Sequence, residues 1–165
     1  MAVDDIPETG LHIELEAPTT ARDEIARIAG LRALTRFSAV FDLIRQGDSA
    51  QVMGRVRAQV GQNCVVTLEP IESDIEEKVD LVFAPATAVP TNDGPVAKAA
   101  DDVPEPLAGG AVDLAAVATE FLLLGIDPYP RKAGVKFSPP KVDDAVANPF
   151  AVLEALKKRP EGGQA

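Results

Sequence analysis

Three segments of this chain alternate between apolar and polar residues with a period of two. They span residues 11–17, 31–44 and 51–62, and each places aliphatic or aromatic side chains at every second position. Such alternation is typical of strands that bury one face and expose the other. Residues 46–48 (Gln-Gly-Asp) form a turn signal between the last two segments, which are therefore predicted to pair as an antiparallel hairpin.

The hairpin prediction assigns side chains to two faces. Phe37 and Phe41 fall on the apolar face, together with Gly54, where a glycine suggests a bulge or a close backbone contact. Leu34 falls on the polar face with Arg36. Three arginines are thus expected on the polar face of the hairpin: Arg36, Arg55 and Arg57.

Further elements complete an α+β prediction. A helix is expected to open at Thr20, with Asp23 as its capping partner, and to end at Gly30. Two shorter strands are predicted at 64–71 and 75–83, separated by Ser73 and Asp74. Together these features favour a curved, mainly antiparallel sheet of about five or six strands that curls toward a barrel, with one helix after the first strand and helical C-terminal segments.

Proline-rich stretches divide the second half of the chain. Residues 1–85 are expected to form the core, 86–106 a Pro/Ala-rich linker, 107–136 a helix and Pro-rich segment packed on that core, and 137–165 a flexible tail with a short helix after Asn148-Pro149. The helix of residues 113–124 has Asp113 as its predicted N-cap. Its predicted buried side consists of Leu114, Val117, Ala118, Phe121 and Leu124.

The charge balance is strongly acidic but unevenly distributed. The 165 residues include 26 acidic and 16 basic side chains, for a net charge of −10. Acidic residues dominate the stretch 69–127, whereas 22–57 and 131–159 are mildly basic. An acidic chain is a poor first candidate for nucleic-acid binding, but clustered arginines within it can still contact phosphates.

The three arginines Arg36, Arg55 and Arg57 allow two interpretations. A basic sheet face can follow an RNA backbone, although no stacking aromatics accompany these arginines, because Phe37 and Phe41 lie on the other face. Alternatively, the arginines are solvated and pair with residues of neighbouring strands.

Acidic residues form the second candidate surface. They could bind a basic protein by charge complementarity, could supply a general acid–base pair or a metal site, or could only protect exposed strands. They are Glu69, Glu72, Asp74, Glu76 and Glu77. Tyr129, within the tract Asp-Pro-Tyr-Pro-Arg-Lys, is either part of an exposed docking segment or packed at a rigid corner.

Cysteine and histidine are too few for several classes of site. Cys64 is the single cysteine and His12 the single histidine, so the chain can form neither an internal disulfide nor a structural zinc site by itself. No catalytic residues, metal or cofactor are predicted. No apolar run is long enough to span a membrane and no secretory signal is visible, which favours a cytoplasmic protein.

Two stretches resemble the YceD family, also called large ribosomal RNA subunit accumulation protein. The first is residues 56–70, Val-Arg-Ala-Gln-Val-Gly-Gln-Asn-Cys-Val-Val-Thr-Leu-Glu-Pro, and the second includes residues 113–114, 120, 123 and 127–130. Many members carry a C-x-R-C-L-x-P pattern. Cys64, Leu68 and Pro70 match it, while Val66 and Thr67 replace the arginine and the second cysteine, so a paired thiol is absent. Glu69 and Pro70 are expected to end a strand.

The resemblance implies a non-enzymatic factor in the synthesis, processing or accumulation of large-subunit (23S) ribosomal RNA. Its partner would be precursor RNA, a basic ribosomal protein, or both. Two alternatives remain open: a hydrolase, such as a nuclease, that uses Glu69 and Glu76 with a divalent ion, and an adaptor that binds only protein.

Overall fold

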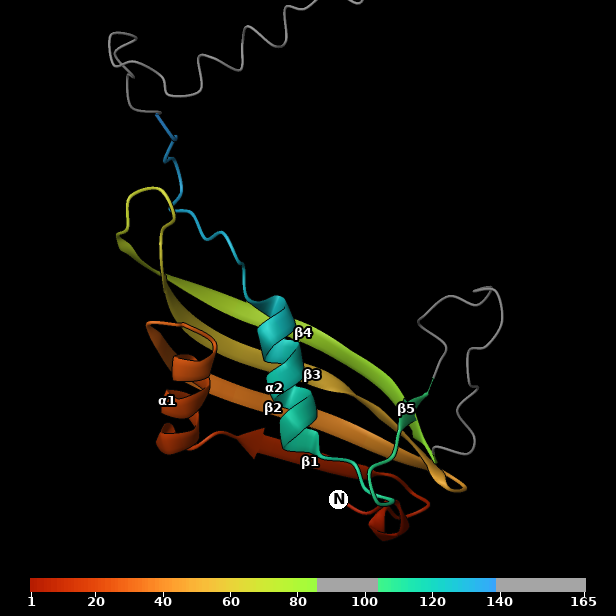
Figure 1. Ribbon diagram of the computed structural model, residues 1–165. Coiled ribbons are helices and arrows are strands. Elements are labelled where there is room, and N and C mark those ends of the chain that lie inside the picture. The colour runs from red at the N-terminus through yellow and green to blue at the C-terminus, as the bar shows by residue number, and fades with distance from the viewer. Residues whose placement is uncertain (86–103, 139–165) are drawn as a thin grey trace, which may run out of the picture. The chain divides into compact units, whose positions relative to one another are not determined.

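The alternating segments form one sheet in a computed structural model that describes residues 1–85 and 104–138. The strands are β1 (Leu11–Glu16), β2 (Ala33–Gln46), β3 (Ser49–Asn63), β4 (Pro70–Ala84) and β5 (Glu105–Pro106), in this order across the sheet (Figure 1). β1 to β4 pair antiparallel, and β5 pairs parallel to the end of β4. The predicted α+β class, mainly antiparallel sheet and hairpin at residues 46–48 are confirmed.

Two details of the predicted sheet are wrong. The sheet of the described residues is open, with β1 and β5 at its edges, rather than curled into a barrel. The predicted strands 64–71 and 75–83 are replaced by one strand, β4, which runs through Ser73 and Asp74 without a break. Alternation continues across these two residues, so their polarity does not end the strand. Pro70 opens β4 instead of ending a strand.

The two helices are capped differently at their N-termini. α1 (Thr19–Ile28) has Pro18 as its N-cap and no side-chain capping bond, so the predicted capping by Thr20 and Asp23 is wrong. α2 (Leu114–Gly125) confirms its predicted N-cap, because Asp113 Oδ1 accepts hydrogen bonds from the Ala115 and Ala116 amides at 3.1 and 3.0 Å. The predicted helix after Asn148-Pro149 lies outside the described residues.

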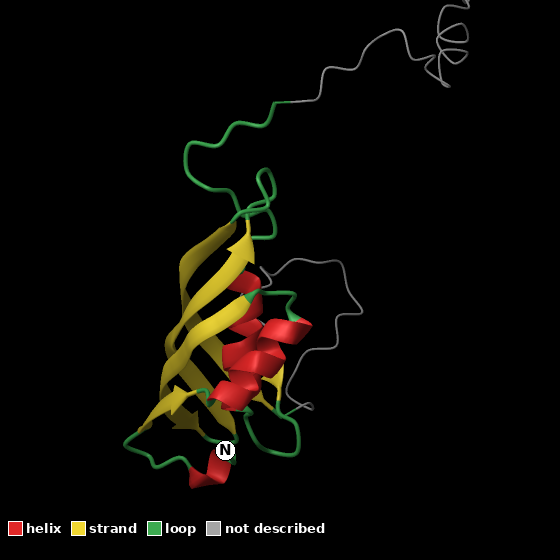
Figure 2. Ribbon diagram, turned by 90° about the vertical axis from the view of Figure 1, so that its left-hand side faces the viewer, coloured by secondary structure: helices red, strands yellow, loops and turns green. Residues whose placement is uncertain are grey.

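A single core lies between the sheet and the two helices, which cover the same face (Figure 2). Phe37 and Phe41 are buried in it, as predicted. The hairpin register shifts between Leu34 and Arg36, and this irregularity turns Leu34 into the core rather than onto the polar face. In α2 the fully buried residue is Leu122, whereas Leu124, predicted to be buried, is exposed.

The N-terminus also belongs to this core. A short 3₁₀ helix, η1 (Val3–Asp5), buries Val3, and Ile6 is buried just after it. The Val3 amide donates a hydrogen bond to the Gly110 carbonyl, and the Met1 ammonium donates one to the Val112 carbonyl. Residues Met1–Val135 form one compact unit, in which two residues of the predicted linker, Glu105 and Pro106, make up β5.

Candidate interaction surfaces

The structure brings Arg36, Arg55 and Arg57 together on the sheet face that carries no helix. We call these three residues the arginine cluster. Cross-strand pairing sets Arg57 opposite Ser38 of β2 and Arg36 opposite Gln59 of β3. Arg36 and Arg57 line one shallow hollow of about 300 Å³, and Arg55 and Arg57 line a second of about 340 Å³. The sequence therefore identified three side chains that do share one surface.

Two members of the arginine cluster share one carboxylate. Arg57 Nε lies 2.9 Å from Glu76 Oε2, and Arg55 Nη1 lies 3.4 Å from Glu76 Oε1. The hydrogen bond and charge of Arg57, with the weaker effect of Arg55, lower the pKa of Glu76 below its usual range. Arg36 makes no side-chain hydrogen bond or ion pair within residues 1–85 and 104–138. It is the member of the cluster with the least competition for a phosphate.

Acidic residues flank the arginine cluster on both sides. The alternation of β4 puts Glu72, Asp74 and Glu76 on the exposed face beside it. On the other side, β1 exposes Glu14 and Glu16 on the same face. β4 also presents Lys78 on this face, opposite Arg55, so the arginine cluster lies between acidic residues of β1 and acidic residues of the first half of β4.

The five predicted acidic residues do not form one surface. Glu72, Asp74 and Glu76 share the exposed face, but Glu77 pairs with Val56 on the helix-covered face. Glu69 lies in the turn before β4, where Lys132 Nζ is 2.8 Å from its Oε2 and lowers the pKa of Glu69. Each group of acidic residues thus has different neighbours.

The turn between β3 and β4, residues 64–69, holds the segment that follows α2. We call it the Cys64 turn. The turn closes through bonds from the Cys64 amide to the Glu69 carbonyl and from the Leu68 amide to the Cys64 carbonyl, both 2.8 Å. Leu68, at φ 60°, adopts the left-handed conformation that tight turns require. The Val65 amide then donates to the Pro130 carbonyl at 2.9 Å.

Cys64 itself is fully buried and its sulfur accepts a hydrogen bond from the Lys132 amide at 3.4 Å. This bond, aided by donors of Thr67 and Val66, lowers the pKa of the thiol to about 6, although burial acts in the opposite direction. The sequence singled out Cys64 but missed its partner Lys132. The available signal was the opposite charges of Glu69, in the first stretch that resembles the family, and Lys132, two residues after the second.

Tyr129 is 71% exposed on this segment. Its amide is bonded to Asp127 Oδ1 at 2.8 Å, which fixes the backbone and leaves the ring in solvent. The exposure agrees with a docking segment rather than a packed corner, while the docking role itself stays a prediction.

The carboxylates that a hydrolase would use do not converge. Glu69 is bonded to Lys132, whereas Glu76 is bonded to two arginines. His12 Nδ1 lies 2.7 Å from Asp42 Oδ1, which raises the pKa of His12, and neither residue touches the Cys64 turn. Among the described residues, no three ligand-type side chains are grouped so that they could hold a metal ion.

Comparison with known proteins gives one result. The family model described as large ribosomal RNA subunit accumulation protein YceD matches residues 52–157, more than half of the chain. The match includes β3 except for its first three residues, the Cys64 turn, β4 and α2. The chain matches no curated protein and no solved structure. Within the part of the chain that the structure describes, no helix is long and apolar enough to cross a membrane.

Proposed function

Because the chain belongs to the YceD family, we propose that it is a non-enzymatic cytoplasmic factor that supports accumulation of large-subunit ribosomal RNA by binding the precursor RNA. The family description supplies the process. The observation that supports RNA as the direct ligand is the arginine cluster, three guanidinium groups on the helix-free face of the sheet.

The geometry favours contact with phosphates rather than with bases. Guanidinium groups bind phosphate through paired donors. The face of β2 and β3 around the arginines carries Ser38, Gln59 and Val40 instead of exposed aromatic rings. Phosphate contact without stacking is largely independent of sequence and falls steeply with salt. A structured precursor is therefore recognised by its backbone.

Glu76 competes with the RNA for two of the three arginines. Because Arg55 and Arg57 are both bonded to its carboxylate, a phosphate must displace Glu76 or share its partners. If the arginines bind RNA, removal of this competition should change the affinity for RNA, whereas arginines that are only solvated would show no such effect. Glu76→Gln removes the competing charge and should tighten RNA binding.

The test measures binding of a transcript of the large-subunit precursor RNA at several salt concentrations. Arg36→Glu should weaken binding about tenfold. The triple change to Glu at positions 36, 55 and 57 should make the fall of log K with log salt less steep, by about two to three in the slope. Arg27→Glu is the matched control, since Arg27 lies on α1 and, among the described residues, has one ion-pair partner, Glu24 at 4.0 Å.

Sedimentation of cell lysate on sucrose gradients gives the second readout. The protein should migrate with large-subunit precursors at low salt and return to the top of the gradient at high salt. RNA binding that survives the triple change, or that is weakened equally by Arg27→Glu, contradicts the assignment to the arginine cluster.

A further inference from the structure

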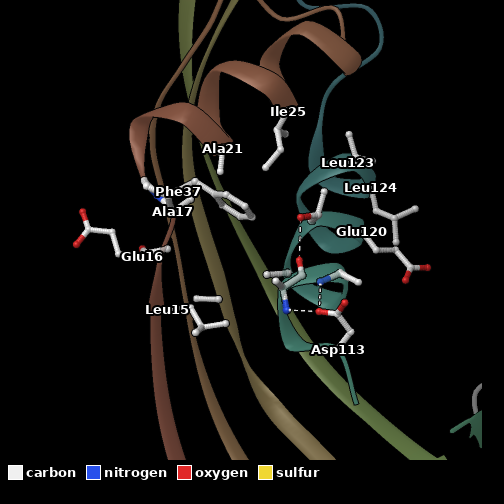
Figure 3. Close-up of a pocket in the computed structure, with 17 residues that line it drawn as sticks. Leu15, Glu16, Ala17, Ala21, Ile25, Phe37, Asp113, Glu120, Leu123 and Leu124 are labelled. Carbon is white, nitrogen blue, oxygen red and sulfur yellow. Dashed lines mark hydrogen bonds between the residues drawn. The ribbon is translucent and has the colours of Figure 1, made fainter. Parts of the chain in front are cut away.

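An apolar groove lies on the other face of the sheet, between α1 and α2. Its volume is about 790 Å³, and Leu15 and Phe37 form part of its floor. Ala21 and Ile25 of α1 line one wall, while Leu123 and Leu124 of α2 line the other (Figure 3). The two helices therefore cover the sheet without closing over it.

The composition of α2 indicates that it should be covered on more than one side. Thr119 and Glu120 are its only residues with a polar side chain, and a helix that is apolar all round is normally buried. Leu122 is fully buried against the sheet, yet Leu123 is 43% exposed and Leu124 is 72% exposed. Two neighbouring leucines that line the groove are therefore partly or largely exposed.

Two polar groups that line the groove, the Thr119 hydroxyl and the Asp113 carboxylate, are bonded to the backbone of α2. The Thr119 hydroxyl donates to the Ala115 carbonyl at 2.8 Å, and the Asp113 carboxylate caps the first turn. An occupant therefore meets mainly an apolar surface, bounded by Ala115 and Ala116 at one end of α2 and by the two leucines at the other. The alanines allow the backbone of a bound partner to approach closely, and the leucines provide apolar surface that the partner can bury.

The charges around the groove all have the same sign. Its charged lining residues are Glu16, Asp113 and Glu120, with no lysine or arginine among them. The Glu16 side chain alternates onto the helix-free face with Glu14, and Figure 3 shows it projecting away from the groove. Glu120 is exposed on α2 and has no ion-pair partner within the described residues. Positive charges beside an apolar stripe would complement the margin that carries Glu120.

We propose that this groove binds an amphipathic helix of a basic protein. Apolar residues spaced three and four apart insert between α1 and α2, and lysines or arginines beside that stripe face Glu120. The 12 residues of α2 extend about 18 Å, so the groove accommodates about three turns of the partner helix. The identity of the partner rests on the proposed function, and we infer that it is a basic protein of the large ribosomal subunit.

Photo-cross-linking tests the proposal with total protein extracted from large ribosomal subunits as the probe. A benzophenone side chain replaces Leu124 in the groove or, as a control, Val40, which is exposed on the opposite face of the sheet. The Leu124 position should cross-link to one or a few basic proteins, and the Val40 position should not. The cross-link should weaken as salt is raised.

Charge and shape variants extend the test without disturbing the core. Leu124→Asp and Glu120→Lys, both at exposed positions, should each weaken the affinity for the cross-linked protein about tenfold. The matched controls are Ile44→Asp and Glu14→Lys on the helix-free face, which should leave the affinity unchanged.

Equal cross-linking from Leu124 and Val40 would overturn the proposal, as would an adduct with a second copy or with another part of the same chain. RNA binding separates this result from the proposed function. Leu124→Asp should bind the precursor transcript normally, and the triple arginine variant should still cross-link. Loss of RNA binding alone refutes the RNA assignment, whereas loss of the cross-link alone refutes the groove.

Discussion

At the scale of single residues, Cys64 shows how an unremarkable side chain acquires its properties from distant parts of the chain. The resemblance to the family identified the residue, but its chemistry depends on Lys132, whose amide donates to the sulfur across a sequence separation of 68 residues. Replacement of the second cysteine of the family pattern by Thr67 leaves a lone thiol held by N–H donors. Its role in the described residues is to join the turn to the segment after α2.

The lowered pKa of Cys64 makes stability depend on pH. The thiol has a pKa of about 6 in the folded chain and about 8.5 when unfolded. The unfolded state therefore binds more protons between these values, so this contribution is fully present above about pH 8.5 and is lost as the pH falls toward 6. Urea unfolding at pH 6 and at pH 9 measures the difference.

Cys64→Ser is the variant that checks this prediction. A serine hydroxyl accepts the same hydrogen bond but does not ionise in this range, so the rise in stability from pH 6 to pH 9 should become smaller. An unchanged pH dependence in the Ser variant would show that other groups cause it.

At the scale of elements, the β2–β3 hairpin depends on a close approach at Gly54. This glycine lies opposite Phe41 in the register, as its place on the apolar face of the sequence suggested. A Cβ at this position would overlap the Val40 carbonyl oxygen and lie 2.8 Å from Phe41 Cδ1. The absence of a side chain therefore lets the ring of Phe41 pack over the neighbouring strand.

Gly54→Ala should destabilise the protein by about 1–3 kcal/mol, because the backbone or Phe41 has to move. Gly61→Ala is the control in the same strand, since its Cβ would meet the nearest atoms only at 3.5 Å. Thermal unfolding of both variants measures the difference. Equal losses would mean that strand propensity, rather than the overlap, determines the cost.

The start of α2 gives a second prediction at this scale. Asp113→Ala removes the acceptor for two amides and should cost about 1 kcal/mol of folding free energy. Asp113→Asn retains the capping oxygen and should recover most of the loss. Urea midpoints of the two variants decide whether capping or charge matters, since a similar loss in both would favour charge.

At the scale of the whole molecule, one core connects parts that the sequence treated separately. Val3 and Ile6 near the N-terminus, Phe41 in the sheet and Leu122 in α2 are all buried in the same cluster. The residues before β1 carried no signal of this role. Unfolding of α2 and of the sheet is therefore expected to be a single cooperative event.

Leu122→Ala tests this coupling. It should lower stability by about 2–5 kcal/mol, because Leu122 is fully buried against the sheet. Amide hydrogen exchange should speed up in β2 and β3 as well as in α2. Faster exchange limited to α2 would show that the helix opens independently, and Leu124→Ala, at an exposed position, should change neither region.

The sequence by itself determined strands β1, β2 and β3, the hairpin, the N-cap at Asp113 and the shared face of Arg36, Arg55 and Arg57. These features depend on local periodicity and on residues close in the chain, which one sequence displays directly. It could not determine that β4 runs unbroken through Ser73 and Asp74, because polar residues suit both a turn and an exposed strand face. The register shift that buries Leu34 was likewise invisible, since it depends on pairing with β3.

Only the tertiary structure decided how these elements meet. It bonded Glu76 to two arginines, brought Lys132 to Cys64 and left Leu124 exposed on α2. Each outcome depends on contacts between residues far apart in the sequence, whose partners are fixed by packing around the common core. The charge and apolar pattern of the chain identified candidate groups, and the fold determined which of them are free to bind.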